Sequence, residues 1–235
     1  MAELARELRS ALLSAGAALV GFADMRQVPA SARQDLPRAI SIAVELDPAI
    51  VAAIRSGPTE DYVGEYNRRN QQLARLGDLA VSLLEQQGHQ ASTWPPSQAG
   101  VDPATLSTVL PHKTAATRAG LGWIGRCATV VTEAFGSAIR LTTVLTDAPL
   151  PVGTPLDESR CGRCRVCADR CPGRAVRGQE WQLGTAREEL LDAFACRDTA
   201  KRLGEAKGLT YTICGRCVAL CPKSEAYLRR AGALG

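Results

Sequence analysis

The sequence predicts a layered α/β or α+β domain followed by a small cysteine-rich module. Two observations predict this division. Residues 1–159 carry a net charge of −3, whereas residues 160–235 carry a net charge of +7. All nine cysteines lie after residue 126, and eight of them lie after residue 160. The segment between these two parts is rich in Pro and Gly, so we expect domains over residues 1–155 and 156–235.

The composition is that of an ordinary globular protein. Hydrophobic residues make up 46% of the chain and charged residues 22%, which excludes a disordered or fibrous chain. The longest early uncharged stretch, residues 10–23, is too short to span a bilayer, and the first ten residues mix Glu with Arg instead of forming a basic export signal. We therefore expect a cytoplasmic protein with no membrane partner. In a reducing compartment, nine cysteines indicate metal ligation rather than disulfides.

The first half of the chain alternates between helix and strand patterns. Residues 2–15 are predicted to form a helix, because leucines at every fourth position share one face. The apolar runs at residues 17–23 and 39–46 have the length of strands and suit a sheet that is covered on both faces. A long helix is predicted over residues 59–87, with Thr59 as its N-cap and Gly88 at its end. Its apolar stripe is interpreted as core.

The next part of the chain predicts a loop, a short helix and two strands. Residues 90–104 are rich in Pro and Ser and indicate an extended loop. A helix is expected over residues 112–119, and strands over 127–131 and 137–147, with a turn at Gly136. This mixture of helices and strands indicates an α/β or α+β domain.

The strongest signal in the sequence is the spacing of its cysteines. Residues 161–172 read CGRCRVCADRCP, the C-x₂-C-x₂-C-x₃-C-P spacing that wraps a [4Fe–4S] cluster. A second set consists of Cys196 and the segment CGRCVALCP at residues 214–222. A cube-shaped cluster needs four thiolates from different directions, so a tight run supplies three and a distant cysteine supplies the fourth. The eight cysteines therefore predict two [4Fe–4S] clusters.

The ligands can be divided between the clusters by the rule that the last cysteine of each run binds the other cluster. The first cluster then takes Cys161, Cys164, Cys167 and Cys221, and the second takes Cys171, Cys196, Cys214 and Cys217. The alternative is two Cys₄ zinc sites, which C-x₂-C pairs also permit. Zinc does not require three cysteines at this spacing followed by x₃-C-P, so clusters are the favoured interpretation.

A glycine-rich segment, GLGWIG, places Gly120, Gly122 and Gly125 in the G-x-G-x-x-G pattern. In a dinucleotide-binding site this pattern follows a strand and opens a helix. Here the preceding residues indicate a helix and the following ones a strand, so a dinucleotide site is not favoured. The glycines would still permit close approach of the backbone to a flat cofactor, with Trp123 available to pack on it or to fill the core.

These motifs together resemble one known family. The stretch HKTAATRAGLGWIGRCATVV, then FGSAIRLTTVLTDAPLP, then CGRCRVCADRCP is similar to the epoxyqueuosine reductases and, more distantly, to the reductive dehalogenases. The resemblance covers about residues 111–222. It implies a nitroreductase-like α/β core, a C-terminal ferredoxin-like module with two [4Fe–4S] clusters, and a cobalamin held between them. It also implies that electrons arrive singly through the clusters and that a reduced cobalt centre reduces an electrophilic substrate.

The resemblance implies candidate site residues in addition to the glycine loop. Asp102 is the counterpart of the family's proton-donating Asp, although its spacing to Gly120 is about one helical turn longer. His112 is a candidate for catalysis or cofactor contact, with a structural role as the alternative, and Lys113 is a candidate for positioning an anionic group. Cys127 stands where the family has a small polar residue, and it is either a buried apolar thiol or a ligand or nucleophile that faces the cofactor.

The predicted function is an iron–sulfur reductase that uses cobalamin, with FMN as the alternative cofactor. Its expected partners are reduced ferredoxin or flavodoxin as electron donor and a small molecule or modified nucleoside as substrate, with tRNA left open. A second hypothesis is a ferredoxin-like electron-transfer protein that serves a corrinoid protein or flavoenzyme. The arginines around the cysteines could tune the cluster potentials or attract an acidic donor. They could also bind nucleic acid, but the aromatic residues that would stack bases are missing between them.

Overall fold

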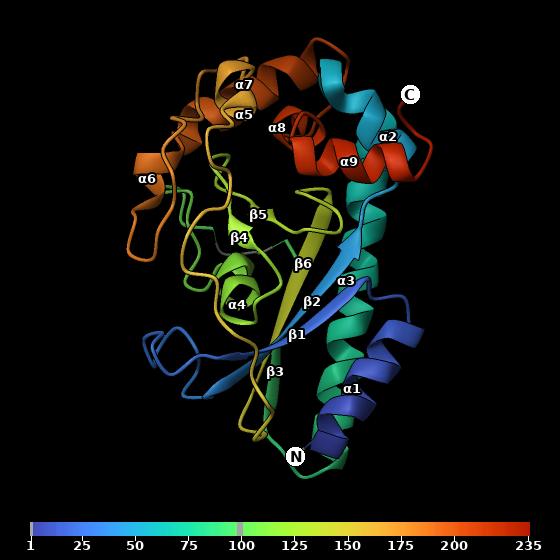
Figure 1. Ribbon diagram of the computed structural model, residues 1–235, viewed down its shortest axis with the longest axis vertical. Coiled ribbons are helices and arrows are strands. Elements are labelled where there is room, and N and C mark those ends of the chain that lie inside the picture. The colour runs from blue at the N-terminus through green and yellow to red at the C-terminus, as the bar shows by residue number, and fades with distance from the viewer. Residues whose placement is uncertain (1, 98–100) are drawn as a thin grey trace. The chain divides into compact units, whose positions relative to one another are not determined.

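The computed structural model describes residues 2–97 and 101–235 (Figure 1). The chain divides into two compact units. The first consists of the chain up to Val44, Arg69–Leu121 and Arg140–Leu156, and the second of Glu45–Arg68, Gly122–Ile139 and Asp157–Gly235. The last border lies next to the boundary expected at residue 155. Because two earlier segments also join the second unit, the domain limits 1–155 and 156–235 remain a prediction.

The first unit is built on a four-stranded sheet with the strand order β1-β2-β6-β3 (Figure 1). The strands are β1 (Leu19–Asp24), β2 (Arg38–Glu45), β3 (Ala91–Trp94) and β6 (Ile139–Thr146). β1 is antiparallel to β2, and β3 is antiparallel to β6. All inner residues of β1 and β2 are buried, which confirms that the sheet is covered on both faces.

Helices cover the two faces of this sheet. On one face, α1 (Ala2–Ser14) and α3 (Glu60–Gln86) pack their apolar stripes against alternate strand residues. That core consists mainly of Leu8, Leu12, Val20, Phe22, Ile40, Ile42, Val44, Leu73, Leu76, Ala80, Leu84 and Val144. On the other face, α4 (His112–Arg118) packs through Ala115 against Ala23, Ala39 and Leu145. The helices and strands expected from periodicity in this unit are confirmed, with end shifts of one or two residues.

The ends of α3 are formed as the sequence predicts. The Oγ1 atom of Thr59 accepts a hydrogen bond of 3.2 Å from the backbone N–H of Tyr62, which makes Thr59 the N-cap. At the other end, Gly88 has a φ of +79°, and the N–H of His89 donates to the carbonyl of Leu84. A left-handed residue at this position is favourable for glycine, so Gly88 ends the helix.

Two expectations about strands are wrong. The loop expected over residues 90–104 contains strand β3, whose residues pair with β6, while residues 98–100 lie outside the described residues. The strand expected over 127–131 is reduced to β5 (Val130–Val131), which pairs with β4 (Trp123–Ile124). Ala128 has a φ of +60°, a left-handed conformation that cannot belong to a strand, so the backbone turns there.

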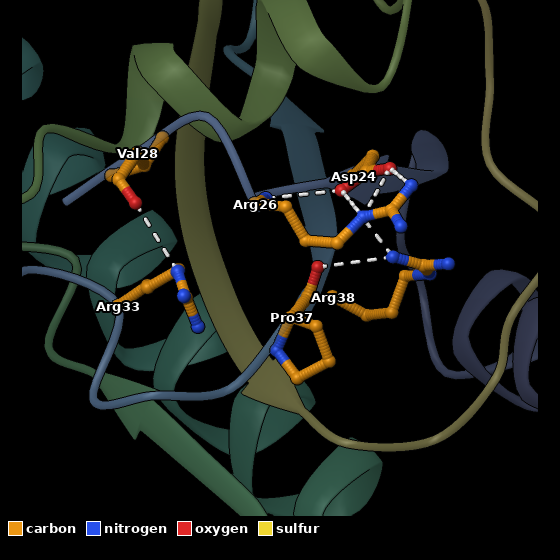
Figure 2. Close-up of polar contacts among 6 residues, drawn as sticks. All are labelled: Asp24, Arg26, Val28, Arg33, Pro37 and Arg38. Carbon is orange, nitrogen blue, oxygen red and sulfur yellow. Dashed lines mark hydrogen bonds and ion pairs between the residues drawn. The ribbon is translucent and has the colours of Figure 1, made fainter. Parts of the chain in front are cut away.

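An ion-pair network holds the loop that connects β1 to β2 (Figure 2). Asp24 accepts hydrogen bonds from the backbone N–H and the guanidinium of Arg26, and Nη1 of Arg38 lies 3.3 Å from its carboxylate. The hydrogen bond from the Arg26 side chain is the main cause that lowers the pKa of Asp24 to about 2. In the same loop, Nε of Arg33 donates to the carbonyl of Val28. The loop is therefore anchored at both strand ends.

The second unit is mostly helical. Besides β4, β5 and the first turns of α3, its elements are α2 (Pro48–Ala53), η1 (Ile54–Ser56), α5 (Val166–Asp169), α6 (Arg187–Leu190), α7 (Ala193–Glu205), α8 (Arg216–Ala219) and α9 (Pro222–Arg230). One core joins α2 to α8 and α9 through Val51, Ile54, Ala219 and Leu228. Within the part of the chain that is described, no helix combines the length and the apolar character that a membrane crossing requires.

Candidate functional site

The eight cysteines with cluster spacing lie on helices and on the segments that precede or follow them. Cys167 is on α5, Cys196 on α7 and Cys217 on α8. Cys171 and Cys221 each precede a proline, and the second of these prolines is the first residue of α9. A proline at the first helical position loses no hydrogen bond, because its missing N–H would be unpaired there. All of these thiols are free.

The thiols interact in two groups. The charges of Cys171 and Cys214 contribute to raising the pKa of Cys196. The charges of these three thiols contribute to raising the pKa of Cys217. Cys161 influences both Cys167 and Cys221 in the same way. We call Cys161, Cys167 and Cys221 the first thiol group, and Cys171, Cys196, Cys214 and Cys217 the second thiol group. Cys167 also interacts with Cys217, so the two groups adjoin.

Burial makes these thiols poor acids without a metal. Desolvation is the main cause that raises the pKa of Cys196, Cys214, Cys217 and Cys221 above the ordinary value. Thiolate is the form that binds metal, so the negative charge must be compensated in place. Iron bound to the sulfur atoms provides that compensation, because a coordinating thiol is deprotonated outright. The chemistry of this donor set therefore fits iron–sulfur clusters.

The geometry of the described residues also bears on whether they form a site for a single metal ion. Among the described residues, no three His, Cys, Asp or Glu side chains come together in an arrangement that would hold one metal ion. The assignment of the eight cysteines to clusters rests on their spacing and their donor chemistry, and it remains a prediction.

Arg126 ties together the backbone around the first cysteine turn. Its guanidinium donates to the carbonyl oxygen of Gly178 and, at 2.6 Å, to that of Gly162. It also pairs with Glu180 at 3.0 Å, and its side chain is only 12% exposed. Gly162 lies between the first two cysteines of the CGRC run, so Arg126 fixes the loop that would present them. No motif in the sequence marks Arg126 for this role.

Cys127 lies in the wall of the first thiol group. It is buried, and its interaction with the Cys167 thiol is the main cause that lowers the pKa of Cys127. Its Sγ atom is 2.9 Å from Oγ1 of Thr129, which in turn donates to Oγ of Ser137 at 3.1 Å. The backbone N–H of Ser137 donates to the buried hydroxyl of Ser224. Cys127 is therefore part of a buried polar strip rather than a purely apolar core.

The glycine segment packs against the chain's own atoms. A Cβ atom on Gly122 would lie 2.4 Å from the carbonyl oxygen of Val131. A Cβ atom on Gly125 would lie 2.7 Å from a methyl group of Val131 and 3.4 Å from Sγ of Cys161. Trp123 is 1% exposed, and its indole Nε1 has no acceptor among the described residues. These glycines are thus explained by close packing, while Trp123 leaves one buried donor to be satisfied.

His112 is held by two hydrogen bonds in the first unit. Its Nε2 atom lies 3.1 Å from the carbonyl oxygen of Pro95, which can only accept, so Nε2 carries the hydrogen. Nδ1 then accepts from the hydroxyl of Thr143 at 3.0 Å. Burial lowers the pKa of His112, which keeps the imidazole neutral. Both ring nitrogens are engaged in holding β3 and β6 to α4.

The other predicted residues of the first unit lie around α4 and the turn that precedes it. Asp102 is exposed and accepts hydrogen bonds from the Thr105 hydroxyl at 2.7 Å and the Ala104 N–H at 2.9 Å. The hydrogen bond from Thr105 is the main cause that lowers its pKa, so Asp102 is a carboxylate that holds a turn. Lys113 is half-buried in the first turn of α4. Gly120 has a φ of +73°, and its missing side chain leaves room for the carbonyl oxygen of Thr154.

The predicted site residues thus fall into two sets. Asp102, His112, Lys113 and Gly120 belong to the first unit, and Gly122, Trp123, Gly125 and Cys127 belong to the second. Of these, Gly125 and Cys127 are brought next to the first thiol group. The roles proposed for all eight residues remain predictions.

Comparison with known proteins identifies the cysteine segment. Residues 160–224 match the family model of the 4Fe–4S double cluster binding domain. This range contains all eight cysteines of the predicted ligand sets and the two thiol groups. The match supports clusters over zinc.

The chain also matches parts of named enzymes. The epoxyqueuosine reductase of Vibrio cholerae is 30% identical over 158 residues, which cover 65% of this chain and 40% of that protein. This chain resembles the epoxyqueuosine reductases. The enzyme of Pseudomonas aeruginosa is 43% identical over 67 residues, which cover 28% of this chain and 19% of that protein. In these two comparisons the chain spans about a fifth to two fifths of the epoxyqueuosine reductase.

Solved structures share the fold. A catabolic reductive dehalogenase in complex with 3-bromo-4-hydroxybenzoic acid matches with a TM-score of 0.67 and 19% identity, over 92% of this chain and 31% of that chain. An epoxyqueuosine reductase with an epoxyqueuosine-modified tRNA stem loop matches with a TM-score of 0.63 and 18% identity, over 96% of this chain and 66% of that chain. The mixed α/β fold with its double-cluster segment is therefore shared with both kinds of enzyme.

Proposed function

We propose that this chain is an iron–sulfur oxidoreductase that passes single electrons through two [4Fe–4S] clusters to a cobalamin, which reduces a small electrophilic substrate. The observation that carries the proposal is the spacing of eight cysteines within the segment that matches the double-cluster family, seven of which form the two adjoining thiol groups. Adjoining clusters provide a path for electrons into the protein. The first unit is inferred to be a nitroreductase-like core that binds the cofactor and the substrate.

Cobalamin is supported by the relatives and by one buried atom. One solved relative is a reductive dehalogenase whose structure suggests a mechanism for B12-dependent dehalogenation. Bound cobalamin supplies a cobalt centre that takes up electrons one at a time and delivers them to an electrophile. Trp123 would hold it, because its buried Nε1–H lacks an acceptor and the corrin ring carries amide carbonyls that accept such a bond. FMN is the alternative cofactor, since flavin reductases also use a nitroreductase-like core.

The proposed substrate is suggested by the same relatives. We propose a small molecule or a modified nucleoside as substrate, with tRNA as one carrier of that nucleoside, because a solved relative holds a modified tRNA stem loop. Reduced ferredoxin or flavodoxin is proposed as the electron donor. We propose that the reaction takes place in the cytoplasm, because nine free thiols suit a reducing compartment.

A cofactor-binding experiment tests this proposal. The full chain is reconstituted anaerobically with iron and sulfide, and cobalamin is then added while the visible spectrum is recorded. We expect a spectral change as the cofactor binds and its axial ligand dissociates, together with cobalt retained through gel filtration. An unchanged spectrum with no retained cobalt would remove cobalamin, and retained FMN would select the alternative cofactor.

A second function, electron transfer to a partner corrinoid protein or flavoenzyme, is favoured by the first unit. The two acid–base candidates there, Asp102 and His112, both use their polar atoms to hold the fold. An electron carrier needs no such groups for catalysis. This function predicts that the reduced chain passes electrons to a partner protein without retaining either cofactor.

A further inference from the structure

The second thiol group reaches the surface of its unit through α7. Of the nine cysteines, all of which the structure describes, Cys196 alone is exposed. Phe194, two residues earlier on the same helix, is 41% exposed, and the guanidinium of Arg197 lies 5.3 Å from the centroid of its ring. Aromatic and Arg side chains are enriched in protein interfaces. An exposed candidate ligand is therefore accompanied by the residue types that bind other proteins.

A second segment of the chain lies against this part of α7. A Cβ atom on Gly173 would lie 2.3 Å from Oγ1 of Thr199 and 3.2 Å from the carbonyl oxygen of Ala195. The backbone N–H of Asp192, which caps α7, donates to the carbonyl of Ala175 at 2.9 Å. The turn that follows Cys171 thus packs on the first turns of α7. This turn brings Arg170 and Arg174, which flank Cys171, to the same part of the unit as Cys196.

The charges here are not balanced within the unit. Arg170 and Arg174 are exposed, and neither forms an ion pair with any residue that the structure describes. The neighbouring acids have partners of their own, since Asp198 lies 3.5 Å from Arg197 and Asp192 lies 3.6 Å from Arg177. The surface around the exposed thiol therefore carries an excess of positive charge. Such a surface attracts proteins of opposite charge and speeds their association.

We propose that an acidic, low-potential one-electron donor protein docks on this surface, which we call the entry face and define as Arg170, Arg174, Phe194, Cys196 and Arg197. The inference rests on the proposed function, because it requires a cluster on the second thiol group. Each encounter oxidises the donor by one electron and reduces that cluster from [4Fe–4S]²⁺ to [4Fe–4S]⁺. No bond is made or broken and no proton is transferred.

The entry face specifies the chemistry of its partner. A partner that fits Phe194 has a flat apolar area near its redox centre. Carboxylates around that area would pair with Arg170 and Arg174. Electron transfer slows steeply with distance, so the exposed Cys196 is the thiol of the second group that a docked donor approaches most readily. Electron-transfer complexes bury little surface and dissociate quickly, and a small face of this kind is suited to them.

The test compares charge-reversal variants in the full, cluster-loaded chain, with an acidic flavodoxin as the probe. Two quantities are measured: the rate of cluster reduction by reduced flavodoxin, followed by absorbance, and the affinity for oxidised flavodoxin, followed by calorimetry. The variant Arg170→Glu/Arg174→Glu should lower both by about tenfold or more at low salt. The difference should shrink as salt is raised, because exposed charges are screened beyond about 8 Å at physiological ionic strength. Phe194→Ala should weaken binding at every salt concentration.

The controls separate this inference from the proposed function. Arg75→Glu makes half of this charge change on an exposed residue of α3 in the first unit, and it should alter both quantities less than about twofold. Iron and sulfide content and reduction by dithionite should be unchanged in every variant. If dithionite also fails to reduce the unmodified chain, the proposed function fails. If dithionite succeeds but the double variant reacts with flavodoxin as the unmodified chain does, the entry face is wrong. Loss of binding to an RNA stem loop, with flavodoxin unaffected, would likewise overturn it in favour of nucleic acid.

Discussion

The Sγ atom of Cys127 lies 2.9 Å from the Oγ1 atom of Thr129, within a buried strip that also holds the hydroxyl of Ser137. Interaction with Cys167, a member of the first thiol group, is the main cause that lowers the pKa of the same thiol. A ninth cysteine therefore stands beside the eight whose spacing predicts clusters. Its position raises the question of whether it binds iron or only supports a cysteine that does.

Substitution of Cys127 answers that question. Because eight other cysteines complete two ligand sets, both Cys127→Ser and Cys127→Ala should retain about eight iron atoms per chain. The Ala variant should lose about 1 kcal/mol in the free energy of unfolding, since it removes a buried group and leaves the Thr129 hydroxyl short of a partner. The Ser variant should lose less. Iron analysis and chemical unfolding measure these effects, and a loss of about four iron atoms in both variants would instead make Cys127 a ligand.

Arg126 should stabilise the loop that presents the first cysteines. Arg126→Ala leaves the carbonyl oxygen of Gly162 without its charged donor and leaves that of Gly178 with Arg165 alone, and we expect a loss of about 2 kcal/mol in the free energy of unfolding. Iron should also be released faster to a chelator. The matched control is Arg75→Ala on the exposed side of α3, which should change stability by less than about 0.5 kcal/mol. Equal behaviour of the two variants would show that the Arg126 contacts contribute nothing.

The division of ligands between the clusters can be tested with paired substitutions. Cys161 and Cys221 are assigned to the same cluster, so Cys161→Ala/Cys221→Ala should retain about four iron atoms and one EPR signal after reduction. Cys161 and Cys171 are assigned to different clusters although they lie in one run of sequence. Cys161→Ala/Cys171→Ala should therefore lose both clusters. The opposite pattern would mean that each run serves its own cluster.

The buried His112 should make stability depend on pH. Its pKa in the folded chain lies below the ordinary value of 6.5, so the unfolded chain takes up the proton first as the pH falls. The contribution of the neutral imidazole is present above pH 6.5 and is lost as the pH falls toward the lowered pKa. Between about pH 8 and about pH 5.5, His112→Gln should therefore lose less stability than the unmodified chain. Anaerobic chemical unfolding at several pH values measures this, and parallel curves would contradict it.

Asp24 provides the control for that experiment. Its pKa is lowered from 3.8 to about 2, so its ion pair with Arg26 contributes fully above pH 3.8 and is lost only as the pH falls toward 2. Arg26 is 67% exposed, so solvent screens the pair and its contribution to stability is small. Asp24→Asn should therefore lower stability by the same small amount at every pH in the neutral range. A pH-dependent effect would show that the Asp24 carboxylate is not held as Figure 2 shows it.

Local patterns predicted much of the first unit. The leucines of α1, the Thr59 cap and the Gly88 end are signals carried by adjacent residues, and each is confirmed. The strand β3 was missed because its polar Ser92 and Thr93 lie next to two prolines, and only its pairing with β6 reveals it. The two strands are about fifty residues apart in the sequence, so their pairing cannot be predicted from the residues close to either strand.

In the candidate site, too, the features that depend on adjacent residues were predicted and those that depend on distant contacts were not. The cysteine spacing is local, so it predicted two ligand sets that the thiol groups and the double-cluster match support. The roles of Arg126 and Ser224 depend on contacts with distant segments, as in the bond from Arg126 to Gly178. No short motif marks such residues. His112 was singled out by its position in a recognisable stretch, but its two hydrogen bonds come from partners that the sequence does not place beside it.

The measurement that tests the account most directly is the metal and sulfide content of the full chain purified without oxygen. Two [4Fe–4S] clusters predict about eight iron atoms and about eight acid-labile sulfides per chain, with a brown colour that dithionite bleaches. Zinc bound to a colourless chain without acid-labile sulfide would contradict the account.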